Sequence, residues 1–272
     1  MAHTIGFIGA GNMASSLIGG MIAKGTPAAS IAAFDPHTEG LQALASQTGI
    51  AACDSNAQLI ERSDIVVIAV KPQVLKQVLS PLAANFQAKK PLIISIVAGI
   101  TSASIEQWIG AAAIVRCMPN TPALVQLGAS GLVANSNVSS EQRAQAQDVL
   151  EAVGIVQWLE NEQQIDAVTA VSGSGPAYFF LLMESMIEAG VAQGLSREVA
   201  TQLTLQTAHG AATMPINSDV DAAELRRRVT SPNGTTQAAI ETFEAGGLRK
   251  LTQQALDAAR DRSIELAVEL GA

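Results

Sequence analysis

Aromatic residues are scarce in this chain. Only 3% of its 272 residues are Phe, Trp or Tyr, although 48% are hydrophobic. This composition favours packed helices and buried strands, and it offers no aromatic surface on which nucleic-acid bases could stack. Positive charge is also in short supply, with 16 Lys and Arg against 24 Asp and Glu and a net charge of -8. We therefore expect no nucleic-acid partner.

Cysteines and long apolar runs are few as well. The two cysteines, Cys53 and Cys117, lack the paired spacing of a metal site, so we expect neither bound metal nor a disulfide framework. No uninterrupted apolar run reaches the roughly 18 residues that a membrane span needs. The first residues read as a strand and lack the basic and apolar regions of a leader. The expectation is a soluble, cytoplasmic protein that does not enter a membrane.

Short β-branched runs alternate with helical stretches in the first half of the chain. The runs "IVVIAV" and "LIISIV" are apolar at every position, which is typical of strands buried on both faces in a parallel sheet between helix layers. The expected strands are Thr4–Ile8, Ile31–Phe34, Ile65–Val70, Leu92–Val97 and Ala113–Cys117, with weaker ones at Gly131–Ala134 and Ile155–Trp158.

The pattern changes near Glu160, after which long helical stretches dominate. The sequence therefore predicts an α/β fold, with a Rossmann-type doubly wound sheet over residues 1–160 and an all-α domain over residues 161–272. More apolar residues lie in this second part than one small bundle can hide, so we expect a large homodimer interface there. The expected helices are Glu184–Gln193, Ser196–Met214, Asp221–Val229, Thr236–Ala245 and Leu248–Leu270.

A glycine-rich motif, Gly9-Ala10-Gly11-Asn12-Met13-Ala14, follows the first expected strand and opens a helix. It has the Gly-x-Gly-x-x-Ala form of a dinucleotide-binding loop. Gly9 permits a tight turn, Gly11 lets a pyrophosphate approach the backbone, and Ala14 allows close helix–strand packing. The helix N-terminus would add free N–H groups and partial positive charge. The alternative is a tight turn without a ligand, but its place after the first strand favours dinucleotide binding.

Asp35 ends the next expected strand, 21 residues beyond Ala14. A carboxylate at that point can accept a hydrogen bond from a ribose 2′-OH and would repel a 2′-phosphate, which favours NAD. The other interpretation is that Asp35 caps the turn that follows it. The residues alone leave both open.

Acid–base groups are poorly represented in the helical half. His209 lies among small residues and is more typical of a packed or surface histidine than of a catalyst. Tyr178 has no lysine four residues later, and no lysine occurs between Lys90 and Lys250. An alcohol oxidation needs a base to remove the hydroxyl proton, whereas hydride transfer to a protonated C=N bond needs mainly positioning. The shortage is a weak argument for an imine substrate.

Four further motifs accompany the glycine loop: "AVKPQ" (Ala69–Gln73), "RCMPNTPALV" (Arg116–Val125), "AVSGSGPAYFF" (Ala170–Phe180) and "VTSPNGTT" (Val229–Thr236). Together these motifs resemble the pyrroline-5-carboxylate reductase family over nearly the whole chain. The resemblance implies reduction of Δ1-pyrroline-5-carboxylate to L-proline by NADPH or NADH, the last step of proline biosynthesis. It also implies a Rossmann domain followed by a helical domain that intertwines with a second subunit, in some members within a decamer.

The resemblance assigns roles to individual residues. Members of the family often favour NADPH, which conflicts with the NAD interpretation of Asp35. Thr236 is the nearest candidate for a catalytic proton donor. Most members have two glycines where this chain has Asn233-Gly234; Asn tolerates left-handed backbone angles, so we expect the turn to survive. The implied cofactor residues are Gly9, Gly11, Asn12, Met13, Asn56, Ala69, Val70, Lys71, Pro72, Ala98 and Asn120, and the implied substrate residues are Val229, Ser231, Gly234, Thr235 and Thr236, with Thr169 of the partner subunit nearby.

Three alternatives stay open at this point. "TSPNGTT" is either an anion cradle at a helix N-terminus or an ordinary turn. The chain is either an imine reductase or another nicotinamide-dependent enzyme on the same scaffold, although the missing lysine argues against a hydroxyacid dehydrogenase. It could also be a redox sensor that binds the dinucleotide without catalysing a reaction.

Overall fold

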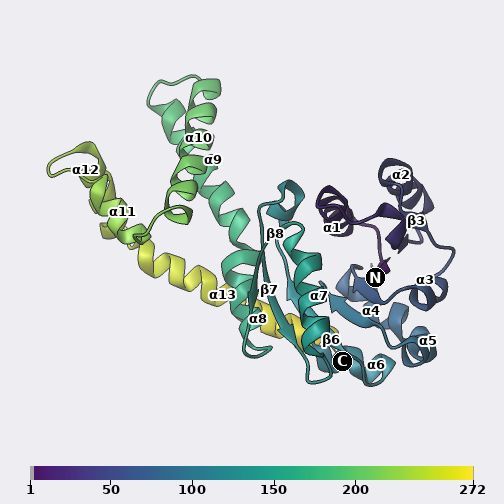
Figure 1. Cartoon of the computed structure of the whole chain (residues 1–272). Helices are drawn as coiled ribbons and strands as arrows, with labels where there is room; N and C mark the ends of the chain where they lie inside the picture. The colour runs from purple at the N-terminus through teal and green to yellow at the C-terminus, as the bar shows by residue number, and fades with distance from the viewer. Residues whose placement is uncertain (1–2, 272) are drawn as a thin grey trace. The chain divides into compact units, whose positions relative to one another are not determined.

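The computed structural model describes residues 3–271. The chain forms two compact units (Figure 1). The first comprises the residues up to Ser174 together with those from Ala258 onward, and the second comprises Gly175–Asp257. Each unit is described by itself.

The first unit is built on an eight-stranded sheet with the order β3-β2-β1-β4-β5-β6-β7-β8. All neighbouring strands pair in parallel except β6 and β7, which are antiparallel. Strand order reverses between β1 and β4, as in doubly wound dinucleotide-binding folds. The strands are β1 (Ile5–Ile8), β2 (Ile31–Phe34), β3 (Ala51–Ala52), β4 (Ile65–Ile68), β5 (Leu92–Ser95), β6 (Ile114–Met118), β7 (Gly128–Ala134) and β8 (Gly154–Trp158).

Helices cover both faces of this sheet and create two hydrophobic cores. Successive residues of β4 alternate between them, Val67 with one core and Val66 and Ile68 with the other. This confirms the prediction, made from the unbroken apolar runs, of strands buried on both faces. The first core involves α1 (Asn12–Ala23), α2 (Thr38–Thr48) and α7 (Ser140–Glu151), and the second α3 (Asn56–Arg62), α4 (Pro72–Leu79), α5 (Ala83–Lys89) and α6 (Ser102–Ile109).

The expected strands are all present, with ends within three residues of those expected. Two features of the sheet were not predicted. The two-residue strand β3 is too short to leave a periodic signal, and β7 runs antiparallel, whereas we expected a parallel sheet. The connection from β6 to β7 holds only the 3₁₀ helix η3 (Thr121–Val125), and a parallel return needs a longer crossover. Two further 3₁₀ turns are η1 (Ala28–Ser30) and η2 (Ser80–Leu82).

The remainder of the chain is helical, as predicted, and an all-α C-terminal part following a Rossmann-type sheet confirms the fold class. The helix α9 begins at Gly175, well before the expected Glu184, because Pro176 is tolerated in a first helical turn. The elements are α8 (Gln164–Val168), the π-helical turn η4 (Thr169–Gly173), α9 (Gly175–Ala192), α10 (Arg197–Ile216), α11 (Ala222–Arg228), α12 (Thr235–Ala245) and α13 (Leu248–Gly271).

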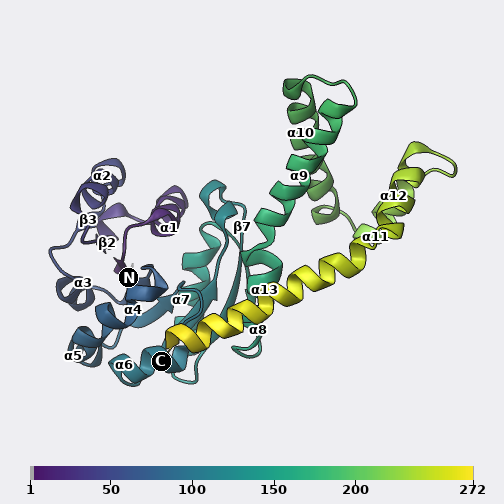
Figure 2. The same ribbon diagram turned by 180° about the vertical axis from the view of Figure 1, so that it is seen from behind.

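The compact units do not follow the boundary that we expected near residue 160. Helices do begin at Gln164, but α8 and η4 belong to the first unit, and α13 starts in the second unit and ends in the first. Figure 2 shows α13 as the long yellow helix. Its last residues return to the sheet-containing unit because their side chains pack there, a long-range effect that composition does not reveal.

Apolar side chains are exposed along the second unit. One helical stretch, Gln164–Ala192, is long and apolar enough by composition to cross a membrane, with 17% of the window buried. Polar and small residues interrupt it, so it contains no unbroken apolar run of membrane-spanning length. The core helix of a soluble protein can pass the same test. Exposed examples in the second unit include Phe179, Phe180, Leu181, Leu182, Met186, Leu203, Leu205 and Ile216.

Candidate active site

The glycine loop lies at the carboxyl edge of the sheet, between β1 and α1. Gly9 adopts a φ of 100°, and a Cβ there would lie 2.7 Å from the carbonyl oxygen of Ala69. Gly11 is the N-cap of α1, no side chain caps this helix, and a Cβ on Gly11 would meet nothing within 4 Å. Gly9 therefore serves the fold, while Gly11 leaves open space in front of a free helix N-terminus, where a pyrophosphate would fit.

Asp35 follows β2 and is half-buried. Its carboxylate accepts two backbone hydrogen bonds, from Ala10 N–H at 2.9 Å and from His37 N–H at 2.8 Å. The first bond ties the glycine loop to the end of β2, and the second caps the following turn. The turn-capping role is thus present, and the remaining lone pairs of the carboxylate stay available to a ribose hydroxyl.

The neighbouring strand ends bring other expected cofactor residues to the same edge. Ala69 N–H donates to the carbonyl of Ile8, 2.9 Å away, and so continues the β1–β4 pairing beyond the strands. Lys71 is the exposed N-cap of α4, and Pro72 is its first residue. A Cβ on Gly9 would meet Ala69 and Val70, so these two residues lie beside the glycine loop, and Lys71 and Pro72 follow them directly in the chain at the carboxyl edge.

Asn56 is the first residue of α3, which Ser55 caps by accepting a hydrogen bond from Gln58 N–H. Its Oδ1 atom is buried and has no hydrogen-bond partner within residues 3–271. Buried acceptors are rarely left unpaired. An orphan acceptor here suits the adenosine contact that the resemblance implies.

Asn120 is buried, and both ends of its side-chain amide bind other parts of the protein. Its Nδ2 donates to the carbonyl of Ser172 at 3.0 Å, and its Oδ1 accepts from Ala129 N–H at 2.9 Å. The side chain thus links the start of η3 to β7 and to the π-helical turn. Its first role is to hold these segments together, and any nicotinamide contact is left to its second amide hydrogen and its backbone.

An ion pair between a buried arginine and a half-buried glutamate, which the sequence did not suggest, lies on the sheet face that carries α6. Arg116 of β6 donates to Glu162 at 3.0 Å, and the Arg116 side chain is only 4% exposed. The same Glu162 oxygen accepts from Ser102 N–H at 2.8 Å. The partners lie 46 and 60 residues apart in sequence, so no local pattern could have found them. Breaking the pair would leave an uncompensated buried charge.

The stretch "TSPNGTT" joins α11 to α12 in the second unit. Gly234 N–H donates to the carbonyl of Ser231 at 3.0 Å, and Asn233 adopts a φ of 58°. Pro232 and Asn233 thus occupy the central positions of a turn that requires a positive φ at the second one. The expectation that Asn233 preserves the turn is confirmed.

The helix α12 opens directly from this turn without a side-chain cap. Gly234 is its N-cap, and Gln237 reaches back to accept from Asn233 N–H at 2.7 Å. The N–H groups of Thr235 and Thr236 therefore belong to the uncapped first turn of an 11-residue helix. Two backbone donors and nearby hydroxyls are the geometry of a small anion cradle.

The approach to this loop is rich in arginine. Hydrogen bonds from Arg227 and then Arg228 hold the pKa of Glu224 at about 2. Arg226 pairs with Glu244 at 3.6 Å. Each of these three arginines is thus already paired with a carboxylate. The group here that suits an anion is therefore the uncapped start of α12.

Other residues singled out by the sequence lie elsewhere. Thr169 is half-buried in η4 of the first unit, and its hydroxyl donates to the carbonyl of Ile165 at 2.8 Å. Val229 is exposed just after α11. His209 is exposed on α10. The hydroxyl of Tyr178 is buried and has no partner in the part of the chain that the structure describes.

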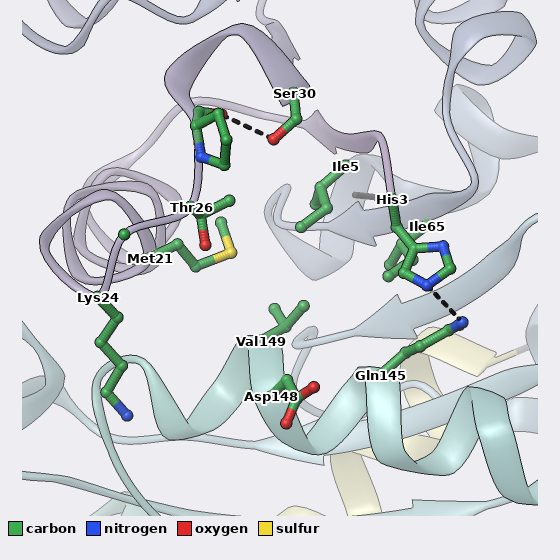
Figure 3. Close-up of a pocket in the computed structure, with 12 residues that line it drawn as sticks. His3, Ile5, Met21, Lys24, Thr26, Ser30, Ile65, Gln145, Asp148 and Val149 are labelled. Atoms are coloured by element: carbon green, nitrogen blue, oxygen red, sulfur yellow. Dashed lines mark hydrogen bonds between the residues drawn. The ribbon is translucent and has the colours of Figure 1, made fainter. Parts of the chain in front are cut away.

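A cavity of about 320 Å³ opens at the opposite edge of the sheet (Figure 3). Figure 3 shows His3 hydrogen-bonded to Gln145, and Met21 and Val149 are among the residues that line the cavity. Lys24 donates to the carbonyl of Glu151. Ligands of open α/β sheets bind at the carboxyl ends of the strands, and these polar groups already have partners, so we do not assign the active site here. Within residues 3–271, no three His, Cys, Asp or Glu side chains group as a metal site would require.

A doubly wound sheet, an open glycine loop at its switch point and a following helical domain define a nicotinamide-dependent oxidoreductase. The family model described as "NADP oxidoreductase coenzyme F420-dependent" matches residues 4–99, and that described as "Pyrroline-5-carboxylate reductase dimerisation" matches residues 162–266. The chain belongs to the pyrroline-5-carboxylate reductase family, as its motifs predicted, and it has the family's dimerisation domain.

Similar proteins support this membership over the whole length. A pyrroline-5-carboxylate reductase of Pseudomonas aeruginosa is 58% identical to this chain, and the alignment covers 98% of each of the two chains. The structure of the Coxiella burnetii reductase matches with a TM-score of 0.94 at 42% identity, covering 98% of this chain and 99% of that one. The Plasmodium falciparum reductase, solved with NADP bound, matches with a TM-score of 0.86 at 32% identity, covering 97% and 98%.

Proposed function

We propose that this chain reduces the C=N bond of Δ1-pyrroline-5-carboxylate to L-proline with NAD(P)H, the reaction of its family, and that the two loops described above divide the work. Residues 1–160 hold the dinucleotide, and residues 161–272 hold the substrate and form the dimer. The observation that carries the proposal is the uncapped start of α12 behind the Ser231–Gly234 turn.

The cofactor lies along the carboxyl edge of the sheet. The N–H groups of α1 bind the pyrophosphate, with Gly9 and Gly11 shaping the loop and Asn12 and Met13 beginning the helix. Asn56 serves the adenosine side, Asp35 lies by the ribose, and the strand ends at Ala69–Pro72 and at Ala98 lead to the nicotinamide. The bound dinucleotide supplies the hydride.

The substrate carboxylate lies in the loop before α12. Thr235 and Thr236 N–H groups and the Ser231 hydroxyl donate to its two oxygens, and Gly234 and Val229 shape the floor. This fixes the ring so that its C=N carbon can face the hydride donor. Thr169 of the partner subunit closes the site.

The chemical step requires one hydride at the ring carbon and one proton at the ring nitrogen. A protonated pyrroline already carries the positive charge that attracts the hydride, so the protein has to orient it and exclude water. Thr236 hydrogen-bonds the ring nitrogen. A threonine hydroxyl is too weak an acid to protonate a free imine, so Thr236 orients the ring or relays a proton through water.

The homodimer is intertwined through the helical domain. The exposed apolar side chains of α9 and α10 support this arrangement, because a monomer would leave them in water. The same burial accounts for the apolar stretch Gln164–Ala192 without a membrane. The acidic net charge of -8 argues against nucleic acid as a partner, and the protein works in the cytoplasm.

A direct spectrophotometric assay tests this function. Purified protein, NADPH or NADH and Δ1-pyrroline-5-carboxylate are mixed, and loss of reduced nicotinamide absorbance is compared with formation of L-proline. We expect one proline for each cofactor oxidised. In a second reaction, which contains NAD(P)⁺ and a 3-hydroxyacid, we expect no reduction of the cofactor. Cofactor binding without turnover of the imine would favour a redox sensor, and activity with hydroxyacids would favour a different dehydrogenase.

A further inference from the structure

The last turns of α13 lie against the loop between β5 and α6, here called the Gly99 loop (residues 96–101). Gly99 has a φ of 71°, and a Cβ on it would lie 3.3 Å from Leu266 Cβ and 3.6 Å from Leu270 Cδ1. A side chain at Gly99 would therefore press on the helix, so the loop packs closely against α13 only because residue 99 is glycine. This contact lies within the first unit, since the residues of α13 from Ala258 onward belong to it.

The Gly99 loop presents one residue outward. Val97 and Ile100 are buried in the second hydrophobic core, and Gly99 is buried against α13, whereas Ala98 is exposed. The loop ends are fixed by hydrogen bonds, from Ile96 N–H to the carbonyl of Ile68 at 3.1 Å and from Ser102 N–H to Glu162 at 2.8 Å. Between these ends, the position of Ala98 depends on what packs beneath Gly99.

The end of α13 is itself firmly placed. Ser263 is buried, and its hydroxyl donates to Asp166 of α8 at 2.7 Å. Leu270 packs against the second core, and Gly271 lies so close to α6 that a Cβ there would be 2.8 Å from Ser104 Oγ. A shift of α13 would therefore move the Gly99 loop, because interiors this closely packed transmit displacement.

We propose that Leu266 and Leu270 are positioning residues for hydride transfer, acting through Gly99 on the backbone at Ala98. They support the loop at the height that places Ala98 against the nicotinamide. The proposal rests on the proposed function in one respect, the placement of Ala98 beside the nicotinamide. It assigns to the C-terminal helix a part in the cofactor site, in addition to dimerisation.

The test compares four proteins: wild type, Leu270→Ala, Leu270→Met and Val268→Ala. Val268 lies on the same turn region of α13 but is 74% exposed, so its truncation is a matched control. We expect Leu270→Ala to lower kcat about fivefold or more, since small misplacements of reacting groups are costly. The Kd for NADPH should change less than about twofold, because the pyrophosphate contacts at α1 are untouched. Leu270→Met should restore kcat, and Val268→Ala should match wild type.

Two readouts do not depend on turnover. In the cofactor-free protein, amide hydrogen exchange of residues 96–101 should be faster in Leu270→Ala. In the binary complex, the fluorescence of bound NADPH should change, because it reports the surroundings of the nicotinamide. These readouts separate this inference from the proposed function: they should shift even if Δ1-pyrroline-5-carboxylate proves not to be the substrate.

The contrary result is equally clear. A lower Tm in Leu270→Ala with unchanged kcat, fluorescence and loop exchange would mean that the contact only stabilises the fold, and the inference would be wrong. If Leu270→Ala does not fold, Leu270→Val gives the same comparison with a smaller truncation. A graded loss from Met to Val supports positioning, and equal kcat values in the two contradict it.

Discussion

The Asp35 carboxylate accepts a 2.9 Å hydrogen bond from the backbone N–H of Ala10, in the middle of the glycine loop. One side chain thus ties the phosphate-binding turn to the end of the strand that bears the expected ribose contact. A substitution that removes the Asp35 oxygen atoms acts both on the shape of the loop and on the charge that a 2′-phosphate would meet.

Removing this charge should change cofactor choice. Asp35→Ser should raise the ratio of kcat/KM for NADPH to that for NADH, by roughly fivefold for a lost repulsion of about 1 kcal/mol. Asp35→Asn is the matched variant, because its amide oxygen can still accept from Ala10 N–H while the charge is gone. Steady-state kinetics with both cofactors measure the ratio. No change in either variant would mean that Asp35 serves only the loop.

Substitution of the two loop glycines by alanine should have different effects on stability and on cofactor binding. Gly11→Ala should leave Tm nearly unchanged, since a Cβ there meets nothing within 4 Å, yet raise the Kd for NADPH about tenfold or more by obstructing the pyrophosphate. Gly9→Ala should instead destabilise the protein by about 1–3 kcal/mol, because its φ of 100° and the Ala69 carbonyl leave no room. Thermal unfolding and cofactor titration of both variants check this. If the two variants showed the same change in Tm and the same change in the Kd for NADPH, the separate roles of Gly9 and Gly11 would be contradicted.

Thr236→Ala should lower kcat/KM for the imine by about one to two powers of ten while leaving NAD(P)H affinity nearly intact. The control is Thr242→Ala on the same helix, where the hydroxyl donates to the carbonyl of Ala238 at 2.9 Å. Its loss should have little effect. Near-normal turnover in Thr236→Ala, or an equal loss of cofactor binding, would mean that the loop is only a turn and does not bind the substrate.

Both cysteines should be unreactive in the folded protein. Burial raises the pKa of Cys117 to about 12, against a hydrogen bond with Ser130 that lowers it, and burial also raises the pKa of Cys53. A raised thiol pKa adds stability below the unfolded value near 9, and this contribution is lost as the pH rises toward 12. At pH 8, a thiol reagent should label neither cysteine until denaturant is added. Rapid labelling of the native protein would show that the thiols are accessible.

The chain should not sediment as a monomer. A 28.1 kDa subunit that exposes Phe179, Phe180 and Leu203 to water would bury them in a second copy. Analytical ultracentrifugation at low micromolar concentration should give a dimer or a multiple of one. A single species at the monomer mass would contradict the dimerisation assigned to the helical domain.

Features with a local signal could be predicted from the sequence. The buried strands follow from unbroken β-branched runs, and β2 was predicted with its observed ends, Ile31–Phe34. The glycine loop follows from its spacing after β1. The left-handed Asn233 follows from the Pro232-Asn233-Gly234 order, because few residues other than Gly and Asn fit that turn position.

The rest depends on contacts between distant residues. One of the two backbone groups that bind Asp35, Ala10 N–H, is 25 residues away, so the sequence left the role of Asp35 open. Arg116 and Glu162 give no local sign of pairing, and nothing in the composition of α13 indicates that Leu266 and Leu270 return to the Gly99 loop. Tertiary packing decides all three.

The most direct test of the account compares Δ1-pyrroline-5-carboxylate with 1-pyrroline, the same cyclic imine without its carboxylate. If the loop before α12 holds that carboxylate, wild-type kcat/KM for 1-pyrroline should be lower by about a hundredfold, the loss of roughly 3 kcal/mol of charge-assisted hydrogen bonding. Ser231→Ala should narrow this gap by weakening only the carboxylate substrate. Equal kcat/KM for the two imines in the wild type, or an unchanged gap in Ser231→Ala, would contradict the assignment of this loop as the carboxylate cradle.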